Sequence, residues 1–218
     1  MQKSSHLQHI HSVFAIITVL ISWASVLDLK LASARSSSAV LYNGVRNLAE
    51  GVDLVSGVSI PGEVAVPAGQ SLHAAVRGEG HQHYLFNGTA WVLQNATAKL
   101  YGDDTEGSDP IGTHFFLPQP DAQGGQPTWE ITSSTTSLTS AVTGKSLASV
   151  TVDSGSITWV LLQATSHAGE AEGILGKVSY IQRLQTRRGL PPSAEGQSLG
   201  DIHSTKYSCI YAFYVQSS

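Results

Sequence analysis

From about residue 60 onward the chain is a succession of short extended segments separated by turn residues. The segments are rich in Val, Ile, Thr and aromatic residues, which favour strands, and Gly, Pro, Asn and Asp lie between them. Residues 157–164 form the clearest buried strand because they are almost continuously apolar. About nine to ten such strands predict a single all-β domain, a β-sandwich or a barrel-like fold.

The strand patterns cover residues 71–77, 82–86, 90–93, 97–101, 111–117, 128–132, 157–164, 174–183 and 207–215. Asn87-Gly88 separates two of these segments and predicts a hairpin turn. Residues 62–67 are expected as a loop or an edge strand. Residues 133–149 are dominated by Ser and Thr, which fits either a mucin-like linker or a pair of strands. We favour strands, because apolar residues recur within this segment.

The N-terminal residues match a secretory signal. Lys3 precedes an uncharged apolar run at 13–24, and the small-x-small site Ala32-Ser33-Ala34 follows. A membrane anchor is the alternative, but the run is shorter than the roughly 20 apolar residues that a spanning helix needs. We therefore expect residues 1–34 to be a signal peptide, cleaved after Ala34 or, alternatively, near Ala24. The mature protein would be secreted to the extracellular space or cell wall, without membrane attachment.

The rest of the chain divides into an N-terminal segment, 35–59, with a short helix expected around 42–50, and a β domain at 60–218. The 12 Lys and Arg residues are outnumbered by 16 Asp and Glu residues, giving a formal net charge of -4. This balance offers no general basic field for nucleic acid. Nucleic-acid binding is therefore not expected.

Cysteine usage and sequons fit the extracellular prediction. Cys209 is the only cysteine, so no internal disulfide forms, and its apolar surroundings favour a buried, inert thiol. Asn87-Gly88-Thr89 and Asn95-Ala96-Thr97 match the acceptor pattern for N-glycosylation. We expect Asn87 to be the better acceptor, because it lies at the tip of the expected hairpin.

Several motifs, taken in order between residues 60 and 214, carry a resemblance to a known family. They are Gly80-x-Gln82-x-Tyr84, Asn87-Gly88-x-x-Trp91, Ala98-x-Leu100-Tyr101, Gly112-Thr113-His114-Phe115, Pro127-Thr128-Trp129-Glu130, Trp159-Val160-Leu161-Leu162, Tyr180-Ile181-Gln182-Arg183 and Tyr211-x-Phe213-Tyr214. In this order and spacing the chain resembles the DUF3455 family, a domain of unknown function. The stretch 119–125 before Pro127 is similar to the plant-type branch.

The resemblance implies secretion and a β-rich fold, and brings no established activity. Many fungal members carry Cys where Phe86 stands and near Gly196, and this chain lacks both. Some relatives are labelled malate dehydrogenase. A dinucleotide site needs a Gly-rich turn between a strand and a helix, and the chain contains no G-x-G-x-x-G. We therefore expect no cofactor.

The family motifs supply candidate ligand-binding residues on separate strands. Gln82, Tyr84, His114, Trp129 and Glu130 could converge in one groove, where aromatic faces and polar groups would bind a carbohydrate or small molecule. The alternative, which we favour, is that the Trp and Tyr residues are core and that His114 and Gln82 satisfy buried backbone groups. Arg183 lies near Arg187-Arg188 and could clamp an anionic ligand or pair with an internal carboxylate.

Two alternatives leave enzyme activity open. His114 with Glu130 could act as acid and base in a hydrolase or isomerase. His81 and His83 share a strand face, because residues i and i+2 point the same way, and His114 could complete a cupin-like metal site. One packed and one exposed histidine would explain the same pattern, and we favour that interpretation, with no metal expected.

Overall fold

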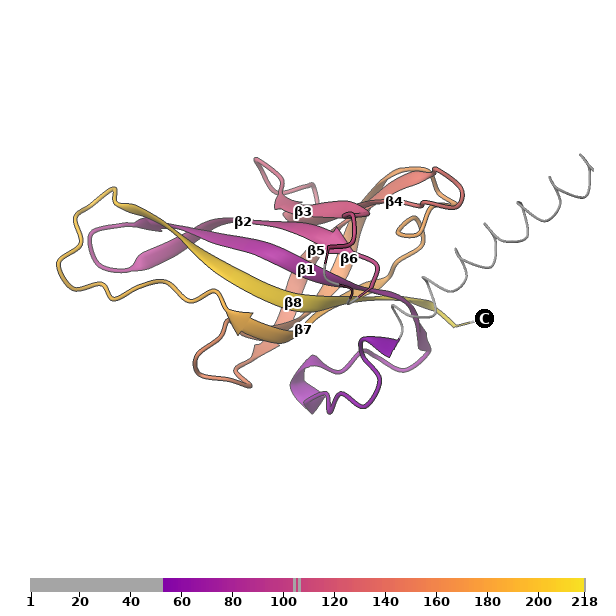
Figure 1. Ribbon diagram of the computed structural model, residues 1–218, viewed down its shortest axis with the longest axis horizontal. Helices are drawn as coiled ribbons and strands as arrows, with labels where there is room; N and C mark the ends of the chain where they lie inside the picture. Colours follow the sequence, from indigo (N-terminus) through magenta and orange to yellow (C-terminus); the bar gives the residue numbers. More distant parts are fainter. Residues whose placement is uncertain (1–52, 104, 106, 218) are drawn as a thin grey trace, which may run out of the picture. The chain divides into compact units, whose positions relative to one another are not determined.

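The computed structural model describes residues 53–103, 105 and 107–217 (Figure 1). The predicted signal peptide at 1–34 and the helix expected around 42–50 lie outside the described residues. Within them, no helix is long and apolar enough to cross a membrane.

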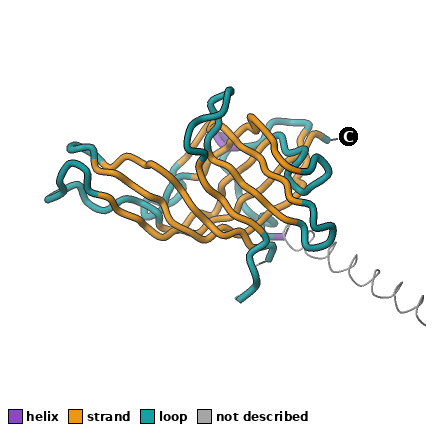
Figure 2. The backbone as a smooth tube through the Cα atoms, turned by 90° about the horizontal axis from the view of Figure 1, so that it is seen from above, coloured by secondary structure: helices purple, strands orange, loops and turns teal. Residues whose placement is uncertain are grey.

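Eight antiparallel strands, each paired with the next along the chain, form the domain (Figures 1 and 2). The last strand pairs with the first, so the sheet closes into a barrel. The strands are β1 (Gln70–Phe86), β2 (Trp91–Tyr101), β3 (Gly112–Phe116), β4 (Pro127–Thr132), β5 (Thr139–Val150), β6 (Trp159–Gly169), β7 (Tyr180–Arg188) and β8 (Ile202–Gln216), preceded by a short 3-10 helix, η1 (Gly62–Val64). The predicted all-β, barrel-like class is confirmed, with eight strands in place of nine or ten.

One reason why the number of strands is lower than predicted lies in β1. Sequence patterns at 71–77 and 82–86 suggested two strands separated by glycines, but β1 runs through them as one strand of 17 residues. Gly80 permits a close approach to β2, since a Cβ at this position would lie 1.8 Å from the Thr97 carbonyl oxygen. The glycine therefore marks tight packing between strands and does not interrupt the strand.

The Ser- and Thr-rich segment is also simpler than predicted. Residues 139–150 form the single strand β5, while the residues before it form a turn in which the Ser133 and Ser137 backbones are hydrogen-bonded to each other at 2.8 Å. Thr128 on β4 and Thr143 on β5 join their hydroxyls at 2.9 Å across the sheet. The segment is therefore part of the barrel wall and not a linker, although it supplies one strand and not two.

Side chains that point inward fill the barrel. The largest of them, each less than 2% exposed, include Trp129 on β4 and Tyr211 and Phe213 on β8. They pack with one aliphatic residue from each of β1, β2, β4, β5, β6 and β7 (Val76, Leu100, Ile131, Val142, Leu162 and Ile181). An eight-stranded barrel is just wide enough for such side chains to fill it. The interior is consequently a packed core.

A second apolar cluster lies on the outer face of the sheet. Trp159 and Leu161 alternate with the inward-pointing Val160 and Leu162, so they face outward. They pack with residues of the segment that precedes β1 (Val55, Val58, Ile60, Val64 and Val66). Gln182 donates a hydrogen bond to the Val64 carbonyl at 2.6 Å and holds this segment against the wall.

Three strands continue beyond the barrel at one end. β2 pairs with β3 only at residues 98–100, and β8 pairs with β7 only from Tyr207 onward. The rest of β2 and β8 flank β1 in a three-stranded extension, which projects to the left in Figure 1. The β7–β8 connection is fixed to it by hydrogen bonds from the Tyr84 hydroxyl to the Gly189 carbonyl, at 2.7 Å, and from the Trp91 indole to the Ser193 carbonyl, at 3.3 Å.

Candidate functional site

The predicted ligand-binding residues share the inner face of the sheet. Gln82 and Tyr84 continue the inward row of β1, His114 pairs with Trp129, and Arg183 pairs with Tyr211. The structure thus brings the five residues to one face. However, Gln82 is 1% exposed, Trp129 is 1% exposed and His114 is 4% exposed. They belong to the core, and of the five predicted residues only His114 also contributes to the lining of the open groove described below.

Among the described residues, several polar groups of this interior are held by the protein itself, although Gln82 Nε2 and Trp129 Nε1 are buried without a hydrogen-bond partner. The Arg183 guanidinium donates two hydrogen bonds to the Thr158 carbonyl, at 3.2 and 2.9 Å. The hydroxyls of Tyr207 and Tyr211 lie 2.9 Å apart. Burial raises the pKa of Tyr211 well above its usual value, while the nearby Arg183 charge opposes that shift. This arrangement keeps both tyrosines protonated and fixes Arg183 to the barrel wall.

His114 is a buried, neutral imidazole. Its Nδ1 lies 2.8 Å from the Thr128 carbonyl oxygen, which can only accept, so Nδ1 carries the proton and donates. Burial lowers the pKa of His114 to about 3, which outweighs the opposing effect of this hydrogen bond. At neutral pH the ring is therefore a poor base, and only 4% of it is exposed.

Glu130 does not join His114, which corrects the proposed acid–base pair. Trp129 faces His114 across β3 and β4, and Glu130 is the next residue along β4. Successive strand residues point to opposite faces, so the Glu130 carboxylate lies exposed outside the barrel while the His114 ring is inside. The structure therefore places the two groups on opposite faces of the sheet.

The same alternation of side chains separates the three histidines of the metal site considered above. His81 and His83 do share the outer face of β1, and their ring centroids lie 6.2 Å apart, whereas His114 points inward. His83 uses its two ring nitrogens to contact the hydroxyls of Ser204 and Thr97, each at 2.8 Å. Among the described residues, no group of three or more His, Cys, Asp or Glu side chains is placed to hold a metal ion.

An open polar site lies instead on the outer face, where one row of directly paired residues crosses five strands. Glu79 on β1 pairs with Lys99 on β2 and with Ser208 on β8. Lys99 pairs in turn with Thr113 on β3, and Ser208 pairs with Arg187 on β7. Four strand spacings separate the ends of this row, a span of about 19 Å.

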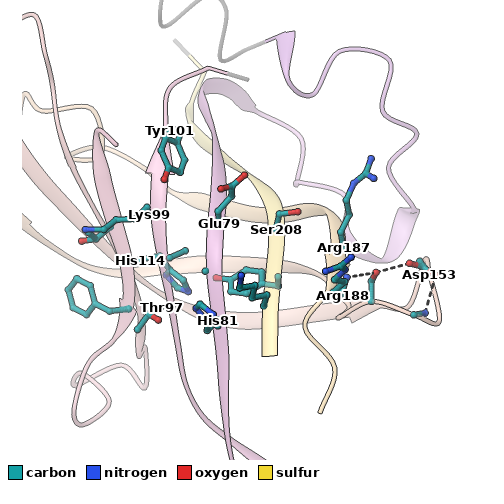
Figure 3. Close-up of a pocket in the computed structure, with 18 residues that line it drawn as sticks. Glu79, His81, Thr97, Lys99, Tyr101, His114, Asp153, Arg187, Arg188 and Ser208 are labelled. Carbon is teal, nitrogen blue, oxygen red and sulfur yellow. Dashed lines mark hydrogen bonds between the residues drawn. The ribbon is translucent and has the colours of Figure 1, made fainter. Parts of the chain in front are cut away.

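This row forms part of the lining of a groove of about 1000 Å³, which we call the outer groove (Figure 3). Its second row of paired residues consists of Thr97, His81 and Lys206. Tyr101 and Phe115 add aromatic surface, and Asp153, Ser156 and Arg188 close one end. In Figure 3, Glu79 and Ser208 lie between Lys99 on one side and Arg187 on the other.

A second hollow of about 830 Å³ adjoins the outer groove and shares three residues with it, Glu79, Arg187 and Ser208. Asp53 and Leu54, from the segment before β1, line this hollow, as do Asp103 and Thr105 from the β2–β3 connection. The two hollows form continuous polar surface along the outer face of β1 and β8.

Most of this groove was not predicted from the sequence, although His114, predicted to bind a ligand, contributes to its lining. His81 was considered as a metal ligand or as one of a packed and an exposed pair, and Arg187-Arg188 as neighbours of Arg183. The available signal was the alternation of polar residues in Glu79-x-His81, Thr97-x-Lys99-x-Tyr101 and Lys206-x-Ser208, which predicts side chains on one face of each strand. It could not show that these three faces lie side by side, because that depends on the register of β1 with β2 and β8.

Fold and site together define a closed, eight-stranded antiparallel barrel with a polar groove on its outer wall. Residues 67–215 match the family described as protein of unknown function (DUF3455), and the chain belongs to this family. The resemblance drawn from the sequence motifs is thereby confirmed. No curated protein and no solved structure matches the chain.

Proposed function

We propose that this protein is a secreted binding protein of the extracellular space or cell wall, and that its outer groove holds a carbohydrate. The observation that carries the proposal is the row from Thr113 to Arg187, which presents side chains of five strands along one open groove. A rigid sheet positions these groups without any rearrangement, which lowers the entropic cost of binding.

The chemistry of the groove suits a sugar chain. Hydroxyls of Thr97, Thr113 and Ser208, with charged groups beside them, provide directional hydrogen bonds to sugar hydroxyls. The half-buried ring of Phe115 offers an apolar face against which a sugar ring can stack, and Tyr101 adds the face of its ring that Arg77 does not cover. The span of about 19 Å is long enough for an extended ligand of several rings.

The extracellular part of the proposal is supported by the sequence. The apolar run at 13–24 and the site Ala32-Ser33-Ala34 match a secretory signal, and both sequons fit passage through the secretory pathway. Binding without catalysis is supported by the separation of His114 from Glu130, since the acid–base pair considered for an enzyme does not meet.

A glycan array followed by titration calorimetry of each hit tests the proposal. We expect binding of at least one oligosaccharide, lost in Ser208→Trp, because Ser208 lines both hollows and a bulky side chain there would fill the groove. The matched control is Ser149→Trp, an exposed strand position outside the groove, which should bind as the unmodified protein does. Absence of any glycan binding, or equal loss in both variants, would contradict the proposal.

A further inference from the structure

We propose that the outer groove selects an acidic carbohydrate, a saccharide chain that carries carboxylate groups along its length. This inference rests on the proposed function of the same groove and adds the class of ligand. It follows from the charges around the groove, from the partners that those charges already have, and from their spacing.

Cationic side chains are concentrated at the groove. Lys99, Lys206, Arg187 and Arg188 all line it, although the whole chain contains only 12 Lys and Arg residues and has a net charge of -4. In the part of the chain that the structure describes, none of these four cations has an ion-pair partner. Lys99, Lys206, Arg187 and Arg188 are also exposed, so their charges are available to a ligand.

The two carboxylates that line the same groove are engaged by the protein. Glu79 forms an ion pair with Arg77, whose guanidinium also lies 4.5 Å from the centre of the Tyr101 ring. Asp153 accepts hydrogen bonds from the Ser156 hydroxyl at 2.6 Å and from the Gly155 amide at 3.0 Å. Each of these two negative charges is thus partly satisfied by the protein, whereas, among the described residues, the four cations that line the groove are not.

The spacing of the cations favours a ligand with repeated charges over one with a single anionic group. Lys99 and Arg187 lie in the same row but three strands apart, a separation of about 14 Å between their backbones. Lys206 lies on β8 two residues from Ser208, in the neighbouring row. A lone phosphate or carboxylate could reach only part of this set, whereas a chain bearing regularly spaced carboxylates could contact all of it.

The direct test compares two probes with the same sugar backbone, an oligogalacturonate and its fully methyl-esterified form. We expect the acid form to bind at least about tenfold more tightly at low ionic strength. That preference should shrink in about 0.5 M NaCl, where charges are screened within a few ångströms. The double variant Lys99→Gln/Lys206→Gln should lose about tenfold in affinity for the acid form and keep its affinity for the ester.

A control variant and a second polyanion distinguish the possible outcomes of this test. Lys145→Gln/Lys177→Gln removes the same charge from exposed positions outside the groove and should leave both affinities unchanged. Equal, salt-independent binding of acid and ester would overturn this inference while leaving carbohydrate binding in place. Binding of a short single-stranded DNA as tightly as the oligogalacturonate would also overturn it, because the groove would then be a general polyanion site. If neither saccharide binds and the glycan array is also blank, the proposed function itself falls.

Discussion

His114 stacks on Trp129 inside the barrel, with ring centroids 4.6 Å apart and ring planes 18° from parallel. The contact holds a titratable ring at the centre of an aromatic cluster that also includes Tyr211, at 5.2 Å from His114. Charging this ring within the core is costly, because burial removes the water that would solvate the imidazolium.

Stability should consequently fall as the solution is acidified. The pKa of His114 is about 3 in the folded protein against 6.5 for an unperturbed histidine, so the unfolded chain takes up this proton first. Above pH 6.5 the ring is neutral in both states and the folded protein keeps its full stability. As pH falls from 6.5 toward 3, the free energy of unfolding decreases by about 1.4 kcal/mol per pH unit.

Urea unfolding between about pH 4.5 and 7.5 measures this slope. Hydrogen bonds lower the pKa of Asp121 and Asp153, and those carboxylates affect stability at lower pH, where they become protonated. In His114→Phe, the free energy of unfolding should depend less steeply on pH, by the equivalent of about one proton. The variant His73→Phe, at an exposed position, should keep the original pH dependence. Identical pH dependence in His114→Phe and the unmodified protein would show that His114 is not the group responsible.

Gly80→Ala should destabilise the barrel by about 2–3 kcal/mol, because the added methyl group would meet backbone and not a movable side chain. The new Cβ would lie 1.8 Å from the Thr97 carbonyl oxygen and 2.6 Å from the Ala98 Cα. Gly62→Ala is the matched control, since nothing lies within 4 Å of its added Cβ. Chemical denaturation of both variants provides the measurement, and equal stabilities would refute the close approach of β1 and β2.

We predict that Asn87, and not Asn95, carries a glycan when the chain passes through a eukaryotic secretory pathway. Asn87 is exposed at the β1–β2 hairpin, where its Oδ1 accepts the Thr89 and Ala90 amides at 3.0 and 2.8 Å. Asn95 is half-buried within β2, and its Oδ1 accepts the Phe116 amide at 3.0 Å.

Intact-mass spectrometry of secreted protein distinguishes the two sequons. Asn87→Gln should remove the glycan mass, whereas Asn95→Gln should leave it in place and lower thermal stability, because the Phe116 amide loses its acceptor. A glycan that persists in Asn87→Gln and disappears in Asn95→Gln would reverse the assignment.

The thiol of Cys209 should be unreactive in the folded protein. It is 2% exposed, and burial raises its pKa to about 12, although Arg183 and Tyr211 act in the opposite direction. A chromogenic disulfide reagent at pH 8 should therefore release no colour from native protein and one equivalent in urea, since the chain has a single cysteine. Rapid reaction of the native protein would mean that the barrel opens readily at β8.

The fold class could be predicted from the sequence because strand preference is local. Runs such as 157–164 and the turn at Asn87-Gly88 depend on residues within a few positions of each other, and both lie in the structure as predicted, in β6 and between β1 and β2. The number of strands was harder to predict, since a glycine that ends a strand and a glycine that allows close packing look alike in sequence. Gly80 is of the second kind, and only the Thr97 backbone beside it shows this.

The candidate site depended on long-range register. The sequence correctly suggested that His81 and His83 share a face, because i and i+2 alternation is a property of one strand. It could not decide which face was inside, and so it grouped His114 with both Glu130 and the outer histidines.

By itself, then, the sequence determined the all-β class, the family and the rows of alternating residues, which are all encoded over short distances. Only the tertiary structure decided that the family motif residues Gln82, His114 and Trp129 form core. It also decided that Lys99, Glu79, Ser208 and Arg187 lie in one row. The physical reason is that closing the barrel joins β1 to β8 across more than a hundred residues, and a shift of one residue in that pairing would exchange the inner and outer faces.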